Sequence, residues 1–247
     1  MAKSHGLGDQ LLIDGVNLSG DVGSVQTINA PSDVFDVSAI NVSAYERILG
    51  KLDGLMEFTS FFNKAAGAQH LTLRAKAAGA NRVCTYLKGS AIGNWAAAIV
   101  AKQVNYDPSR PADGSLSIGV QMVGAAYGLD HGTQLTAGLR TDTAATEGAS
   151  HNNGAASSRG LSAYLHVVAW SGVDMTVSIQ SSSDNGGGDA FANITGGVFT
   201  QSTAIGAERI VTSLTQAVEQ YLRVTTITSG GITSVTFFVA VCRSPVA

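Results

Sequence analysis

Charged residues are scarce in this chain of 247 residues, at 13% of the total. Soluble domains typically contain ~25%. The acidic and basic side chains are spread along the chain, give a formal net charge of −3 and form no basic run. Tight binding to a phosphate backbone needs clustered Lys and Arg, so the composition disfavours a nucleic-acid-binding protein. A surface of Ser, Thr, Asn, Gln, Ala and Gly costs little to desolvate. Such a surface favours packing against copies of the same chain, although a weakly charged monomer is the simpler alternative.

Cysteine and long apolar runs are also scarce. The two cysteines, Cys84 and Cys242, lie in apolar runs, and two cysteines do not make a disulfide framework. We therefore expect buried free thiols. No stretch reaches the ~20 apolar residues that span a bilayer, and Met1 to Gln10 lacks the apolar run of a secretion signal. These features predict a protein made in a cytoplasm and not inserted into a membrane.

The sequence shows no cluster of residues suited to catalysis. Its five histidines have no metal-ligand spacing with each other or with cysteine, and no Gly-x-Ser-x-Gly motif or P-loop is present. The acidic run Asp184 to Asp189 lacks the alternating ligands of a calcium loop and favours a surface turn. We predict no catalytic residue, no metal site and no cofactor, and thus a protein that binds or builds rather than an enzyme.

Strand patterns dominate what is present. Leu11–Ile13 and Val16–Leu18 flank Asp14-Gly15, a pair that favours a type I′ turn, and predict a tight hairpin. The clearest strand is Leu116 to Val123, where apolar and small or polar residues alternate. One short helix is expected over Ala65 to Ala78. The fold class is therefore mainly β.

The composition divides the chain into two domains. Residues 141–160 are Ala, Thr, Ser, Gly and Asn with almost no large apolar side chain, which predicts a flexible linker. It separates a domain over 1–140 from a domain over 161–247. Short strands separated by turns in the second domain predict a β-sandwich. Within the first domain, Asn29 to Gly54 has weak periodicity and is expected to be a long loop, either functional or disordered.

Several motifs in the first domain occur in an order that resembles the tail tube proteins of long-tailed bacteriophages, in particular actinobacteriophage versions with non-contractile, siphovirus-type tails. The resemblance covers roughly residues 10–140. It is carried by these segments: Leu12 to Gly20, Tyr45-Glu46-Arg47, Leu52 to Asn63, Ala101 to Pro108, Asp113-Gly114 and Gln134 to Gly138.

The resemblance implies a β-sandwich or half-barrel with one flanking helix, in a structural protein of the virion. Copies would form homo-hexameric rings, and the rings would stack into a tube whose channel conducts DNA without binding it tightly. Tape measure, tail terminator and distal tail proteins would be its partners.

In such tubes a long loop reaches the next ring. This implies a ring-stacking role for the polar residues of the Asn29 to Gly54 segment, the alternative being a mobile surface loop. The candidates are Asp33, Asp36, Tyr45, Glu46, Arg47 and Lys51.

The second domain resembles the immunoglobulin-like or carbohydrate-binding-like domains appended to phage proteins, so we expect an external decoration whose removal leaves assembly intact. Tyr164, Trp170 and Phe191 are candidates for stacking on a host-surface glycan, or alternatively core residues. The alternative function is therefore a carbohydrate-binding or decoration protein used in host attachment, and a capsid decoration or baseplate protein is a third possibility.

Overall fold

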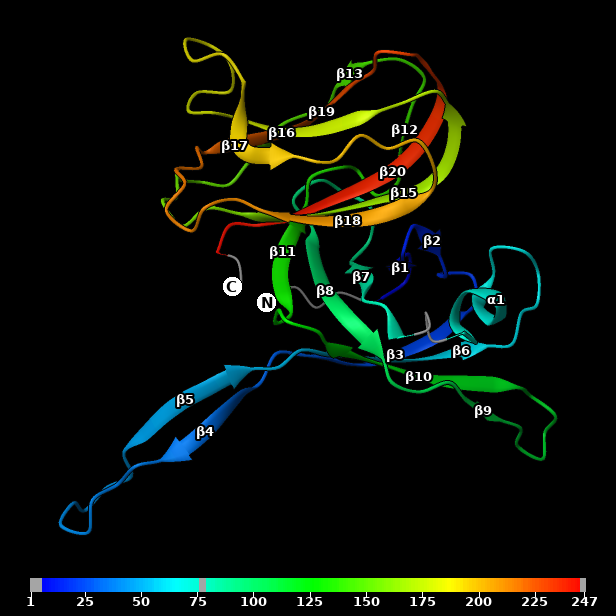
Figure 1. The fold of residues 1–247 in the computed structure, drawn as a ribbon, viewed down its shortest axis with the longest axis vertical. Helices are drawn as coiled ribbons and strands as arrows, with labels where there is room; N and C mark the ends of the chain where they lie inside the picture. Colours follow the sequence, from blue (N-terminus) through cyan, green and yellow to red (C-terminus); the bar gives the residue numbers. More distant parts are fainter. Residues whose placement is uncertain (1–5, 76–78, 245–247) are drawn as a thin grey trace.

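The computed structural model describes residues 6–75 and 79–244, and it is built mainly of β-strands, as predicted (Figure 1). In chain order its elements are β1 Gln10–Ile13, β2 Val16–Asn17, β3 Val22–Asn29, β4 Ser32–Asp36, β5 Arg47–Leu52, β6 Leu55–Phe61, α1 Gln69–Leu73, β7 Arg82–Leu87, β8 Trp95–Gln103, β9 Asp107–Ser109, β10 Ser117–Gly124, β11 Asp130–Gln134, β12 Arg140–Asp142, β13 Thr146–Glu147, β14 His151–Asn152, β15 Ser162–Gly172, β16 Thr176–Ser182, β17 Ala192–Val198, β18 Gly206–Val211, β19 Tyr221–Ile227 and β20 Ile232–Cys242.

The predicted hairpin at Asp14-Gly15 is confirmed. Strand β1 pairs antiparallel with β2, and Ile13 lies opposite Val16. The two turn residues have φ angles of 50° and 81°. A type I′ turn requires positive φ at both central positions. It is favoured in hairpins because its twist matches that of the flanking strands. The local sequence alone is sufficient to specify this turn.

One sheet runs through both halves of the molecule, the lower half with β1 to β11 and the upper half with β12 to β20 (Figure 1). Its strands follow the order β18-β15-β20-β11-β8-β10-β6-β3, with five further strands attached, and make a 13-stranded sheet. Strand β11 pairs with β8 on one side and with β20 on the other. In Figure 1, β8 and β11 rise from the lower half to meet the upper half. The two halves are therefore joined by backbone pairing as well as by the connecting chain.

The upper half is a β-sandwich, as predicted. A second sheet, in the order β13-β19-β16-β17 with β14 also on β19, lies against the part of the long sheet formed by β15 and β20. Alternate residues of these strands form a shared core. Its largest fully buried members include Phe199 and Phe237.

The lower half has its own core. Strands β1, β6, β7, β8 and β10 contribute apolar residues, and Leu73 of α1 packs against them. The alternation predicted for Leu116 to Val123 is confirmed, since Ile118, Val120 and Met122 are buried. Both cysteines are free and buried, also as predicted.

The predicted helix is shorter than expected. It spans only Gln69–Leu73, and residues 76–78 of the predicted range lie outside the described residues. Gly67 has a φ of 72°, which ends any helical path before Ala68, and Gly79 has a φ of 81°. Alanine content favours a longer helix, but the positive φ of Gly67 is incompatible with a helix that begins at Ala65.

The segment predicted as a flexible linker contains structure. Within and beside residues 141–160, β12 pairs with β20, and β13 and β14 pair with β19. Arg140 donates two 2.7 Å hydrogen bonds to Asp142, whose carboxylate also accepts from Thr226. The prediction was wrong because backbone pairing and a largely buried ion pair order this segment without large apolar side chains.

The interface between the halves contains a buried histidine. His166 of β15 is fully buried; its Nδ1 accepts the N–H of Gly15, and its Nε2 donates to the Thr85 hydroxyl at 2.9 Å. Gly15 leaves no room for a side chain, since a Cβ there would lie 2.5 Å from the carbonyl oxygen of Val167. The β1–β2 turn is thus seated directly on the backbone of the upper half.

We expect His166 to make stability fall as the pH is lowered. Burial lowers the pKa of its imidazole to about 3, against an ordinary unfolded-state value of ~6.5. Between these values only the unfolded chain takes up the proton, so the free energy of unfolding should drop by about 1.4 kcal/mol per pH unit from this group. Urea unfolding at pH 7, 5.5 and 4.5 measures this slope. His166→Gln should show a shallower slope, and equal slopes for the two proteins would contradict the assignment.

A buried ionic network also joins the halves. Asp130 of β11 accepts 2.6 Å hydrogen bonds from Ser162 and Tyr164 of β15. Arg209 of β18 lies 3.6 Å from the same carboxylate, and its Nε donates to the Tyr164 hydroxyl. Burial, followed by the Asp130 charge, raises the pKa of Tyr164, so the phenol stays protonated and donates. Three strands are therefore fixed relative to one another by charge-assisted hydrogen bonds.

Candidate assembly surfaces

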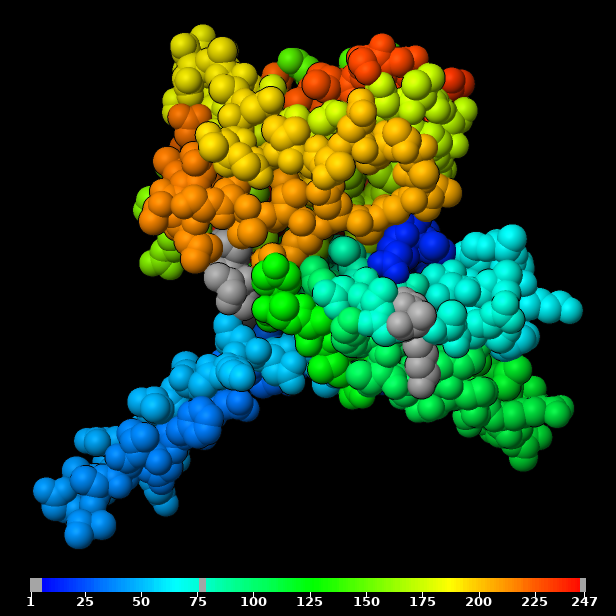
Figure 2. Space-filling model, in the orientation of Figure 1, coloured from blue at the N-terminus to red at the C-terminus, as the bar shows by residue number. Residues whose placement is uncertain are grey.

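A two-stranded ribbon projects from the lower half. Strands β4 and β5 pair only with each other and extend away from the body of the protein, as Figures 1 and 2 show. We call residues 32–52 the arm. The arm occupies most of the segment predicted as a loop, so that prediction was right about its position and wrong about its structure. An isolated two-stranded ribbon is marginally stable in water, which makes an unsupported arm unusual.

The base of the arm is firmly attached to the body. The Asp53 N–H donates to the Pro31 carbonyl at 2.8 Å, and the Gly124 N–H donates to the Gly54 carbonyl at 2.7 Å. Gly54 is buried, and a Cβ there would lie 2.8 Å from the backbone nitrogen of Leu129. The arm therefore leaves the body from a fixed point at the start of β6.

The arm carries apolar side chains on both of its faces. Val34 lies opposite Leu49, and Phe35 lies opposite Ile48. Because successive residues of a strand point to opposite sides, these two pairs define two faces, which we call the valine face and the phenylalanine face. The four side chains are between 53% and 73% exposed. Large apolar side chains gathered on a surface in this way mark a site of interaction.

The six polar residues predicted for ring stacking all lie on the arm or in its tip loop, and all are exposed. Asp36 accepts hydrogen bonds from the hydroxyl and the N–H of Ser38, which lower the pKa of its carboxyl group and shape the turn out of β4. The Arg47 guanidinium lies 4.7 Å from the centre of the Tyr45 ring. The structure thus brings these residues into one element, and their role in stacking stays a prediction.

The apolar residues of the arm were missed by the sequence reasoning. The segment contains nine of the large apolar side chains that are exposed in the described structure. They are Val34, Phe35, Val37, Ile40, Val42, Tyr45, Ile48, Leu49 and Leu52.

A second surface is polar. The outward side of β3, β6 and β10 presents Gln26, Glu57, Thr59 and Gln121. Glu57 accepts from the Thr27 hydroxyl at 2.8 Å and from the Gln121 amide at 2.6 Å, and Gln26 donates to Thr59. None of these side chains is basic. The surface is a hydrogen-bonded network with a single negative charge, which has little attraction for phosphate.

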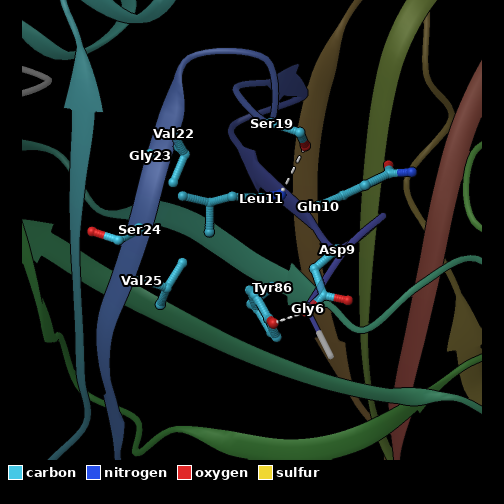
Figure 3. Close-up of a pocket in the computed structure, with 10 residues that line it drawn as sticks. All are labelled: Gly6, Asp9, Gln10, Leu11, Ser19, Val22, Gly23, Ser24, Val25 and Tyr86. Carbon is cyan, nitrogen blue, oxygen red and sulfur yellow. Dashed lines mark hydrogen bonds between the residues drawn. The ribbon is translucent and has the colours of Figure 1, made fainter. Parts of the chain in front are cut away.

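A hollow of about 290 Å³ lies between β1, β3 and Tyr86 (Figure 3). Asp9 accepts hydrogen bonds there from the Tyr86 hydroxyl and the Gly89 N–H, and Ser19 accepts from the Leu11 N–H. Burial and the bond to Asp9 raise the pKa of Tyr86. These groups are engaged in hydrogen bonds, and the Ser19 hydroxyl itself donates to the side-chain oxygen of Asn17. Its lining is Gly6, Asp9, Gln10, Leu11, Ser19, Val22, Gly23, Ser24, Val25 and Tyr86.

The three aromatic residues proposed to stack on a glycan do not come together. Tyr164 is 1% exposed and belongs to the Asp130 network, so its prediction as a sugar contact was wrong. Trp170 packs against the core of the upper half. The Phe191 ring is faced by the Arg223 guanidinium, 4.3 Å from its centre. The alternative prediction of core residues fits Tyr164 and Trp170 better.

Across residues 6–75 and 79–244, no three His, Cys, Asp or Glu side chains are grouped in a way that could bind a metal ion. In the same part of the chain, no helix has the length and apolar character to cross a membrane.

No family model and no curated protein matches the chain. Among solved structures, one chain from the virion of a native gene transfer agent particle is 14% identical, with a TM-score of 0.41 over 52% of this chain and 98% of that one. A chain from the tail of an empty gene transfer agent particle, determined with C6 symmetry, is 14% identical, with a TM-score of 0.40 over 51% of this chain and 97% of that one.

The Dit protein of phage SPP1, described as a hub of the adsorption apparatus in phages that infect Gram-positive hosts, is 10% identical, with a TM-score of 0.30 over 94% of this chain and 98% of that one. Likenesses at these scores do not define a shared fold.

Proposed function

We propose that this chain is a structural protein of a phage tail, a tube subunit whose copies assemble into stacked rings. The observation that carries the proposal is the projecting arm, a ribbon of marginal intrinsic stability with exposed apolar side chains on both faces. Such an element gains stability when another molecule covers it. The order of sequence motifs over residues 10–140 gives independent support for a tail tube subunit, and the ring of six is part of that resemblance.

In this proposal the polar side of β3, β6 and β10 faces the channel. Glu57, Gln26 and Gln121 offer hydrogen bonds and one negative charge but no basic group. Counterion release, which drives tight binding to DNA, requires Lys and Arg. A channel lined in this way lets DNA pass without retaining it. Tape measure, tail terminator and distal tail proteins are the partners proposed for the two ends of the tube.

Electron microscopy of the purified full-length chain, with and without a tape measure protein, tests this function. The proposal predicts hollow tubes or stacked rings with the upper half outside the channel. Discrete particles of 25.3 kDa under all conditions would contradict it. They would favour the carbohydrate-binding or decoration role, and a glycan screen would then be the next experiment.

A matched variant isolates the role of the arm. Ser32 and Leu52 are paired across the base of the ribbon, so residues 33–51 can be replaced by an Asn-Gly turn that closes the shortened hairpin. We expect this variant to melt like the full-length chain, because the arm contributes no side chain to the buried clusters, and to remain monomeric. Tubes formed by the shortened protein would exclude the arm from assembly.

A further inference from the structure

We propose that an exposed proline-containing segment of one copy docks on three aromatic rings of another copy. The segment is residues 108–111, which we call the proline segment. The rings are those of Tyr86, Trp95 and His131, which we call the aromatic row. The contact joins two copies and therefore rests on the self-assembly proposed above, but it involves neither the arm nor the polar side of β3, β6 and β10.

The aromatic row crosses three adjacent strands and reaches the surface. Tyr86 of β7 and His131 of β11 both lie opposite Ala97 of β8, so their backbones are two strand spacings apart, ~9.6 Å. Trp95 lies two residues from Ala97 on the same side of β8. Its ring is 5.5 Å from the Tyr86 ring and 5.8 Å from the His131 ring, centre to centre. Trp95 is 36% exposed and His131 is also exposed, so the row presents aromatic surface to a partner.

The proline segment has the sequence and spacing that such a row binds. Pro108-Ser109-Arg110-Pro111 is a PxxP sequence, the type that aromatic-lined grooves bind in the polyproline II conformation. Its two prolines are three residues apart, so they lie on one side of a polyproline II helix, ~9 Å from each other. This distance matches the width of the aromatic row. Residues 107–115 are all exposed, and the fixed φ of proline reduces the entropy that is lost on binding.

Charge complementarity places the side chain of Arg110 in the hollow beside the aromatic row. Tyr86 lines this hollow of about 290 Å³, and Asp9 lies next to it (Figure 3). The Asp9 carboxylate accepts hydrogen bonds from Tyr86 and Gly89. A carboxylate has about four lone-pair positions, so Asp9 can also accept from a guanidinium. Arg110 makes no hydrogen bond or ion pair with any residue of 6–75 and 79–244, and an ion pair with Asp9 of another copy provides the missing partner.

The position of the proline segment in the fold shows why the partner is a second copy. The hairpin of β9 and β10, which carries the segment, projects from one side of the lower half, and β11 lies on the other side (Figure 1). The segment therefore does not reach the aromatic row of its own chain. When a segment on one side of a molecule binds a different side of the next, the contact is heterologous and continues from copy to copy as a closed ring or an open filament.

Binding of a synthetic peptide of residues 107–115 to the full-length chain tests the contact, at a chain concentration below that needed for assembly. The fluorescence of Trp95 should shift to the blue and saturate, because docking removes its ring from water. A peptide with alanine in place of both prolines should bind at least about tenfold more weakly. The Trp95→Phe variant, which keeps Trp170, should show no fluorescence change. If the wild-type peptide causes no saturable change up to ~1 mM, the proposal is wrong.

A double-mutant cycle tests the ion pair. Asp9→Asn in the chain and Arg110→Ala in the peptide should each weaken binding at least about tenfold, and together they should weaken it little further. Asp113→Asn in the peptide is the control, because Asp113 is exposed in the same loop, and it should bind like the wild-type peptide. Additive effects of the two changes would overturn the proposal, since Arg110 would not then reach Asp9.

The peptide experiment also separates this contact from the proposed function. A chain that binds the peptide but never forms rings or tubes would support the contact between the proline segment and the aromatic row, and would refute the function. A chain that forms tubes but does not bind the peptide would refute the contact and leave the function in place.

Discussion

Removal of residues 160–247 is expected to unfold the lower half rather than release a domain that assembles alone. Strand β20 pairs with β11 and β12. Its residues Phe238 and Ala240 form one buried cluster with Leu12, Leu87 and Ala96 of the lower half. Burial of each large apolar side chain contributes about 1.5–3 kcal/mol, and a whole domain is stable by only about 5–15 kcal/mol. The sequence predicts a first domain, residues 1–140, that is stable alone. The shared core indicates instead that this part of the chain needs residues 160–247.

Circular dichroism and limited proteolysis of a chain ending at residue 159 measure this effect. We expect no cooperative melting transition and rapid digestion. The variant that lacks residues 33–51 is the control, because this smaller deletion uncovers no buried cluster, and it should melt normally. A truncated chain with a cooperative transition close to that of the full-length protein would contradict this view of the interface.

Asp130→Asn is expected to destabilise the protein by about 3–5 kcal/mol, the usual effect of breaking a buried ion pair by changing one partner. The carboxylate is 1% exposed and accepts from Ser162 and Tyr164, with Arg209 at 3.6 Å. The amide that replaces it has the same shape but no charge, and its NH₂ group cannot accept a hydrogen bond.

Urea unfolding of the Asp130→Asn variant gives the free energy directly. Asp107→Asn is the control, because Asp107 is exposed in β9, and such a surface change is expected to have an effect within about 0.5 kcal/mol. An effect of Asp130→Asn as small as that of the control would mean that the network does not fasten the halves together.

The parts of the fold that sequence predicts well are those specified by neighbouring residues. The turn at Asp14-Gly15 needs positive φ at two adjacent positions, and this sequence provides it. The strand around Ile118 has one buried and one exposed side, so its apolar residues alternate. Both signals are complete within a few residues.

The arm lacks such a signal because both of its faces are apolar. Val34 and Phe35 are consecutive, as are Ile48 and Leu49. An alternating pattern disappears when both sides of a strand carry apolar residues, and weak periodicity predicts a loop. The ring-stacking role of the polar residues follows from the resemblance to tail tube proteins, so neither line of reasoning points to the apolar residues that dominate the arm.

The linker and Tyr164 depend on partners far away in the sequence. Asp142 accepts a hydrogen bond from Thr226, and Tyr164 donates to Asp130. Composition cannot reveal that a polar segment pairs with a distant strand, nor which side of a strand an aromatic residue occupies. The sequence also does not show that one sheet continues from β11 to β20. The predicted division into an assembling domain and an appended domain misses this pairing.

A cryo-electron microscopy map of the assembled protein would show whether copies of this chain meet at the arm, residues 32–52. We expect density for another copy against the exposed apolar side chains of the arm, Val34, Phe35, Ile48 and Leu49. An ordered assembly in which the arm projects into solvent would contradict the claim that copies of this chain are joined through it.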